Sequence, residues 1–418
     1  MRELFSNKNF MLYWFGQTIS GIGNWINFIA LNLFILNTFN SGKIMGIFLV
    51  VRMLPSVLFG SFGGFLADRI NKKKLMITCD VLRALIVLGF IFTKNLYIFF
   101  LLGLLISALD KVFMSTRGAF IPEIVRKEKI VEANSFCEMT RSVITVVGPA
   151  LGAFLLCVFN YKTIFVIDSL TFVISVICLL FLSYSPKIIS GLEKKKNNFI
   201  EFFNEQKETL AFLKNHSLLL FAFIVRLFDA LGSGAYNATL PVFSKYFSSI
   251  EIFSKKIHIE NSASYGWIVG VWALGQFIGS FFTNSLLKNS RINLKNLLIF
   301  SIFVKAVGMA LTFQCSILLY ALIFIFISGL GDGVANVFFL SLLMKESPEN
   351  KRGKIFGLIF SILYSTLALG ILITGLFIDS YSIKIITGTA SVIILLGIVA
   401  GKVFIYMKTK VMRKCSSK

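Results

Sequence analysis

The chain has 418 residues, of which 56% are hydrophobic and only 15% are charged, whereas a soluble domain carries about 25% charged residues. This composition excludes a water-soluble globular protein. The formal net charge of +22 is interpreted as a signal of membrane topology and not of nucleic-acid binding, because the basic residues follow the breaks between apolar stretches. The six cysteines show no Cys-x-x-Cys spacing and the two histidines lie in polar connections, so neither a metal site nor a cofactor is expected.

Apolar stretches long enough to cross a bilayer recur along the whole sequence. A helix needs about 20 apolar residues to span the hydrocarbon core. The first stretch is too long for the core of a signal peptide and is expected to remain as the first span. We predict twelve transmembrane helices, at residues 10–37, 43–67, 75–93, 97–119, 135–158, 162–183, 217–243, 264–287, 296–313, 317–343, 355–378 and 384–407.

An even number of spans places both termini on one side of the membrane. Most of the 42 Lys and Arg residues lie in the breaks that face the cytoplasm if the termini do. The positive-inside rule therefore predicts a multi-pass protein of a bacterial plasma (inner) membrane with both termini in the cytoplasm.

The longest polar break divides the chain into two halves of six spans. It predicts an N-terminal six-helix bundle at 1–184, a cytoplasmic linker at 185–216 and a C-terminal six-helix bundle with a short tail at 217–418. Pro-Glu pairs at 122–123 and 348–349 fall at corresponding places in the halves and indicate an internal repeat. The predicted fold class is an all-α membrane protein of two pseudo-symmetric bundles.

A segment rich in glycine and basic residues follows the second span. It contains Gly63, Gly64, Asp68, Arg69, Asn71, Lys72, Lys73 and Lys74. The segment resembles the signature between helices 2 and 3 of the major facilitator superfamily, with Asn71 in place of a glycine, and Asn also tolerates the left-handed backbone of a tight turn. The resemblance implies the major facilitator fold and a loop that latches its two halves in the outward-facing state. A merely topogenic loop would explain the lysines but not Asp68 with its glycines.

The fifth span carries a second motif, in which a Gly-Pro pair is followed by small residues. It reads Gly148, Pro149, Ala150, Leu151, Gly152 and Ala153. This motif resembles the antiporter motif of the same superfamily, with Ala153 in place of the usual last glycine. Proline bends a helix, and small residues let another helix pack against the bend. The resemblance implies an exporter that exchanges substrate for protons, and helix packing alone is the alternative.

Three further segments resemble one branch of the superfamily, the macrolide-efflux and siderophore-export proteins. They are Pro122-Glu123 with Ala133-Asn134, Phe165 to Phe172, and Arg352 to Gly357. The basic residue followed by Gln-Gly in the fourth span, which is typical of other drug-antiporter branches, is missing. A monomer embedded in the lipid bilayer is expected.

Six acids lie within the predicted spans, where ionisable groups are costly and are functional candidates. They are Asp80, Asp110, Glu138, Asp168, Asp229 and Asp332. Three of them have an arginine three positions away on the same helical face, which favours neutralising pairs of Asp80 with Arg83, Glu138 with Arg141, and Asp229 with Arg226. The first two pairs are expected to form an inner gate together with Asp68 and Arg117.

Three of these acids, Asp110, Asp229 and Asp332, lie near mid-depth on spans 4, 7 and 10, which line the central cavity in the superfamily that the chain resembles. Removal from water favours the neutral form of a carboxyl group, so these acids are predicted to bind protons or substrate. Asn24 of the first span is expected to line the same cavity. Four basic residues could pair with the acids or bind an anionic substrate, namely Arg52, Lys111, Arg226 and Lys305.

The predicted function is proton-coupled export of a bulky amphipathic small molecule, macrolide-like or siderophore-like, by alternating access of the two halves. The alternatives are a lipid, lysolipid or nutrient transporter on the same fold and an intramembrane lipid-modifying enzyme. A nucleotide-driven pump is excluded as a single chain, because no GxxxxGK[ST] loop occurs. Neither HExxH nor GxSxG is present, so no enzymatic activity is expected.

Overall fold

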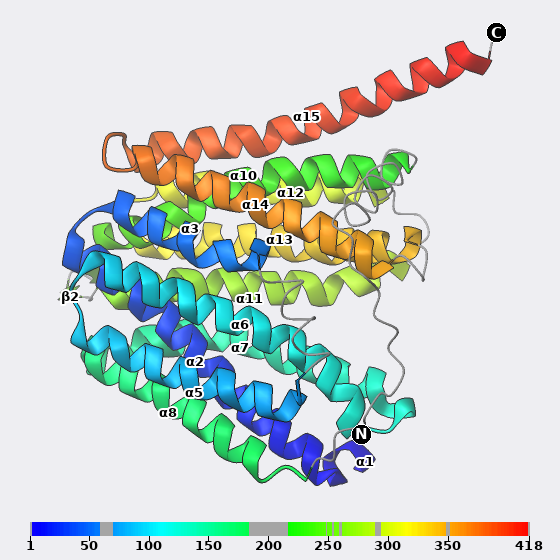
Figure 1. The fold of residues 1–418 in the computed structure, drawn as a ribbon. Coiled ribbons are helices and arrows are strands. Elements are labelled where there is room, and N and C mark those ends of the chain that lie inside the picture. The colour runs from blue at the N-terminus through cyan, green and yellow to red at the C-terminus, as the bar shows by residue number, and fades with distance from the viewer. Residues whose placement is uncertain are drawn as a thin grey trace. The chain divides into compact units, whose positions relative to one another are not determined.

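The computed structural model shows a chain made almost entirely of long helices (Figure 1). It describes residues 2–58, 70–183, 216–247, 249–252, 255–258, 261–288, 294–347 and 352–416. The helices are α1 (Arg2–Ser6), α2 (Lys8–Phe39), α3 (Gly42–Leu58), α5 (Lys72–Phe92), α6 (Leu96–Ile124), α7 (Ile130–Val158), α8 (Tyr161–Leu180), α10 (Ser217–Ser244), α11 (Asn261–Lys288), α12 (Leu294–Gln314), α13 (Leu318–Glu346), α14 (Arg352–Phe377) and α15 (Ile383–Ser416). Two 3-10 turns, η1 (Lys127–Lys129) and η2 (Lys245–Phe247), and two antiparallel strands, β1 (Ser249–Ile252) and β2 (Lys255–His258), complete the described elements.

Each of the twelve predicted spans overlaps with a long helix. Within the described ranges, eleven helices are long and apolar enough to cross a membrane. The remaining span corresponds to α3, whose 17 residues cover the part of span 43–67 that the structure describes. The predicted class of all-α membrane protein is confirmed, and the hydropathy pattern did not predict the short hairpin of β1 and β2.

The chain forms two compact units. The first unit is Met1–Ser190 with Ser244–Gly270, and the second is Gly191–Phe243 with Val271–Lys418. Most of the predicted linker at 185–216 lies outside the described residues, so the predicted division of the chain at that linker stays a prediction.

Asparagine side chains begin four helices of the first unit. The Oδ1 atoms of Asn7, Asn71, Asn95 and Asn160 accept hydrogen bonds from backbone N–H groups in the first turns of α2, α5, α6 and α8. These bonds satisfy donors that the start of a helix leaves unpaired. Asn71, which stands in place of the motif's glycine, does not use the left-handed backbone that asparagine tolerates, since it caps α5 with a φ of −53°. The left-handed asparagine is Asn40, with a φ of 47° at the end of α2.

The first unit has a polar layer between two apolar ends. Its helices α2, α5 and α8 lie side by side, and α2 also contacts α7 (Figure 1). At the end where α2 begins, a buried cluster includes Phe10, Met76 and Phe120. At the end where α2 finishes, aromatic rings pack together, with centroids 4.6 Å apart for Phe90 and Phe99. Asp80, Arg83 and Asp110 lie between these ends along α5 and α6.

In the second unit, glycines bring three helices into backbone contact around one acid. A Cβ atom on Gly331 of α13 would lie 2.5 Å from the carbonyl oxygen of Ser301 in α12, and one on Gly333 would lie 2.1 Å from that of Gln276 in α11. Distances this short leave no room for a side chain, so small residues set the helix spacing. Asp332, between these two glycines, is thereby held among α11, α12 and α13.

Candidate functional site

The predicted gating motif is described only in part. Gly64, Asp68 and Arg69 lie outside the described residues. Lys72 Nζ lies 2.8 Å from Glu123 Oε1 near the end of α6, and Lys73 Nζ donates to the backbone carbonyls of residues 180 and 182 at the end of α8, at 3.0 and 2.8 Å. A cation stabilises the free carbonyls at a helix C-terminus. The two lysines therefore tie the start of α5 to the ends of two neighbouring helices.

Arg117 connects α6 with α7 at this motif's end of the unit. Its Nη2 atom lies 3.9 Å from Glu138 Oε1, and Arg141 Nε lies 3.5 Å from the other oxygen of the same carboxylate. The Glu138 side chain is 59% exposed, so these pairs are solvated contacts that each contribute little to stability. Whether Arg117 also meets Asp68 stays a prediction.

The antiporter-like motif packs α7 closely against α2. A Cβ atom on Gly148 would lie 2.6 Å from the Trp25 side chain, and one on Gly152 would lie 3.1 Å from the Cα atom of Ile26. Pro149 is buried between these glycines in the helix. The motif therefore acts locally as a close-packing surface, and its role in antiport stays a prediction.

In the polar layer of the first unit, Arg83 joins two acids. Its Nη2 atom forms a buried ion pair with Asp80, and its Nη1 atom lies 3.4 Å from Asp110 Oδ1. Ser175 Oγ donates to the second oxygen of Asp80 at 2.7 Å. Asp110 also lies 3.9 Å from Lys111, and its side chain is 37% exposed. Asp110 and Asp80 are thus two ends of one arginine-centred network and not separate sites.

Two polar residues of α2 have different surroundings. Asn24 is half-buried, and within the described part of the chain its side chain forms no hydrogen bond. Asn27 is buried, and its Nδ2 atom donates to Asp168 Oδ2 at 2.5 Å. Asn24 remains a predicted cavity residue, whereas the structure adds Asn27 and Asp168 as a buried polar pair.

Four charged groups of the second unit meet in one buried quartet. Lys305 of α12 lies 2.7 Å from both Asp229 of α10 and Asp332 of α13. Arg226 lies 2.6 Å from Asp229 and 3.6 Å from Asp332. The side chains of Asp229 and Lys305 are only 2% and 6% exposed. Two acids and two bases thus neutralise one another away from water.

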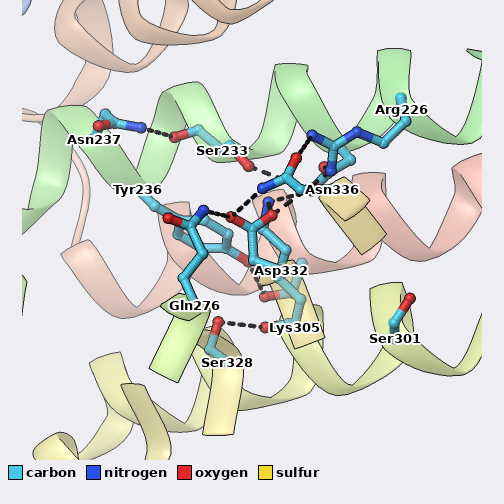
Figure 2. A network of polar contacts seen from close by, with 12 residues as sticks. Arg226, Ser233, Tyr236, Asn237, Gln276, Ser301, Lys305, Ser328, Asp332 and Asn336 are labelled. Carbon is cyan, nitrogen blue, oxygen red and sulfur yellow. Dashed lines mark hydrogen bonds and ion pairs between the residues drawn. The ribbon is translucent and has the colours of Figure 1, made fainter. Parts of the chain in front are cut away.

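Amide side chains complete this quartet (Figure 2). Gln276 Nε2 donates to Asp332 Oδ2 at 2.7 Å, and Asn336 Nδ2 lies 3.3 Å from the same oxygen. Arg226 Nη2 donates in turn to Asn336 Oδ1. A buried charge is stable only when its remaining hydrogen-bonding capacity is met, and these amides meet it. The sequence-based prediction missed Gln276 and Asn336, although Asn336 lies one helical turn after Asp332.

The structure therefore pairs Arg226 with Asp229, as their spacing suggested, adds Asp332, and places Lys305 between the two acids. Of the other basic candidates, Lys111 pairs with Asp110. Arg52 has no carboxylate partner in the described part of the chain, and its guanidinium lies 5.7 and 5.9 Å from the ring centroids of Phe28 and Phe48.

Comparisons with known proteins agree with this fold. The Major Facilitator Superfamily model matches residues 13–248 and 222–417. The chain is 24% identical to macrolide efflux protein A of Streptococcus pyogenes, over 91% of this chain and 93% of that protein. It is 26% identical to the putative bacilysin exporter BacE of Bacillus subtilis, over 94% and 93%. A staphyloferrin A transporter of Staphylococcus aureus is 24% identical, over 69% and 68%.

A solved structure shows the same architecture. The crystal structure of a mutant of the nucleoside transporter NupG superimposes with a TM-score of 0.77 at 14% identity, and covers 94% of this chain and 100% of that one. At this identity the likeness concerns the fold alone. The macrolide efflux protein, the putative bacilysin exporter and the staphyloferrin A transporter among the relatives confirm the resemblance to the macrolide-efflux and siderophore branch that the motifs indicated. The chain belongs to the Major Facilitator Superfamily of membrane transporters.

Proposed function

We propose that this transporter is a secondary active exporter in which proton binding to buried carboxylates drives outward movement of a bulky amphipathic compound by alternating access. The observation that carries the proposal is the quartet of Arg226, Asp229, Lys305 and Asp332. It is neutral when both acids are ionised, so one proton changes its net charge and weakens the attraction that holds α10, α12 and α13 together. Proton binding to the quartet is thereby linked to the packing of three helices.

The names of the relatives support a proposal for the substrate class. Their names concern a macrolide, bacilysin and staphyloferrin A, and we propose a macrolide-like or siderophore-like molecule for this chain. Transport of a lipid, a lysolipid or a nutrient is the second candidate. We propose no enzymatic activity, because the superfamily to which the chain belongs consists of transporters.

We also propose a bacterial plasma membrane location with both termini in the cytoplasm. The lysines at the start of α5 support this orientation, since basic residues gather on the cytoplasmic side. We further propose that two bundles, at 1–184 and 217–418, are joined by a linker and that the transporter is a monomer.

The test is transport by purified protein in proteoliposomes with an imposed pH gradient and a panel of macrolides and siderophores. The parent protein is expected to move at least one compound against its gradient. Asp332→Asn and Asp229→Asn should lose this coupling, because each removes a protonatable member of the quartet, and Asp110→Asn reports whether the first unit contributes. Asp379→Asn, at an exposed acid between α14 and α15, is the matched control. Transport that ignores the pH gradient in the parent protein would contradict the proposal and favour a facilitator or lipid carrier.

A further inference from the structure

Asp168 differs from every other acid of the predicted spans. Its side chain lies on α8 and is fully buried, with 0% exposed. The other five, Asp80, Asp110, Glu138, Asp229 and Asp332, each form an ion pair with a lysine or arginine. Within the described ranges of the chain, no lysine or arginine forms an ion pair with Asp168. Its charge, if it had one, would be buried without a partner.

The hydrogen bonds around Asp168 are too few for an ionised group. Asn27 Nδ2 donates to Oδ2 at 2.5 Å. The Thr171 hydroxyl donates to the backbone carbonyl of Asp168 at 2.7 Å and lies 3.5 Å from Oδ1, so its proton is already used. An ionised carboxylate can accept about four hydrogen bonds. The described contacts supply one hydrogen bond of normal strength to the carboxyl group of Asp168.

Asn27 has an unmet acceptor at the same place. Its Oδ1 atom is buried, and it has no hydrogen-bond partner within the described part of the chain. A protonated carboxyl is a donor, and with a small rotation of either side chain it can give its proton to this amide oxygen while accepting from the amide nitrogen. A neutral Asp168 therefore satisfies both side chains, whereas an ionised one satisfies neither fully.

The charged groups that face Asp168 are engaged elsewhere. Arg83 of α5 pairs with Asp80 and Asp110, and Arg52 of α3 lies against two phenylalanine rings, so both act on Asp168 only at longer range. On α2, the group that faces Asp168 is the uncharged amide of Asn27. Moving a charge from water into such a site without a partner is strongly unfavourable.

We infer that Asp168 carries a proton in this conformation and is the proton-binding group of the first unit. Its part in export rests on the proposed function, but its protonation does not. The proton leaves when water reaches the carboxyl, and the resulting carboxylate is attracted to Arg83 and Arg52. The ligand of this site is thus a proton held between α2 and α8.

The first test is infrared spectroscopy of the purified protein in lipid nanodiscs without substrate. The parent protein is expected to show, at neutral pH, the C=O stretching band of a protonated carboxyl buried away from water. Asp168→Asn should lose this band. Asp80→Asn is the matched control, because Asp80 is equally buried but paired with Arg83, and it should keep the band. An unchanged spectrum in Asp168→Asn would overturn the inference whether or not the chain proves to be an exporter.

A second variant keeps the test open if Asp168→Asn does not fold. Asn27→Val leaves the acid in place and removes only the amide, so the band should remain but shift to the position of a carboxyl without a hydrogen-bonding neighbour. In proteoliposomes, Asp168→Asn should lose transport driven by the pH gradient while retaining substrate binding at equilibrium. Full gradient-driven transport by this variant would overturn the role of Asp168 as a proton carrier even if the infrared band is lost.

Discussion

The two units bury charge in opposite ways. In the second unit, Lys305 bridges two acids, and amides complete the quartet. In the first unit, Arg83 bridges Asp80 and Asp110, but one acid and one base are left apart, Asp168 beside an amide and Arg52 beside aromatic rings. A buried charge can therefore be stabilised by a counter-charge or, for an acid, removed by a proton. Of these two arrangements, only the protonated acid holds a bound proton in this conformation.

The largest expected effect comes from removing the centre of the quartet. Lys305→Met leaves two buried acids to share Arg226, and we expect a loss of about 3–5 kcal/mol in stability. Thermal unfolding in detergent, followed by the loss of monodisperse protein, measures it. The double variant Lys305→Met with Asp332→Asn should recover much of the loss, because it restores one acid to one base. If the single variant unfolds like Asp379→Asn, the quartet does not hold the helices together.

A smaller effect is expected from filling the glycine contacts around Asp332. In Gly331→Val the new Cβ atom would lie only 2.5 Å from the carbonyl oxygen of Ser301. The substitution would force α12 and α13 apart, and we expect the free energy of unfolding to fall by about 1–3 kcal/mol. Gly388→Ala is the matched control, because a Cβ atom there would meet nothing within 4 Å, and it should stabilise α15 by up to about 1 kcal/mol. Equal unfolding temperatures for the two variants would show that α12 and α13 tolerate a wider spacing.

The smallest effect is expected at the base without an acid partner. Arg52→Met loses contacts with two aromatic rings, which contribute about 0.5–2 kcal/mol. Arg83→Met is the comparison within the same unit and should be more destabilising, because it leaves the fully buried Asp80 without its counter-charge. The same thermal-unfolding assay compares them. A larger loss in Arg52→Met than in Arg83→Met would mean that Arg52 compensates an ionised Asp168, against the inference of a neutral acid.

The charged members of the candidate site could be named from the sequence, but their pairing and the amides of Gln276 and Asn336 could not. Asp229, Asp332 and Arg226 could be identified because ionisable residues are rare in apolar spans, and the spacing of Arg226 and Asp229 along one helix predicted their contact. The position of Lys305 between both acids depends on how α12 packs against α13, which the glycines of α13 control. Asp168 could be identified as an intramembrane acid, but the sequence of α8 does not show that its hydrogen-bonding partner on α2 is the uncharged amide of Asn27.

The class of this protein can be inferred from the amino-acid sequence alone. Length, hydropathy and the distribution of basic residues predict twelve spans, and the motifs around Lys72 and Gly148 indicate the superfamily, because these signals are local along the chain. Which charges meet depends on the packing of the helices. Each ion pair that crosses helices joins residues far apart in sequence, and helices of similar hydropathy leave their rotation and neighbours open until side chains pack. The difference between a paired Asp332 and an unpaired Asp168 therefore arises from helix packing and not from the residues next to either acid.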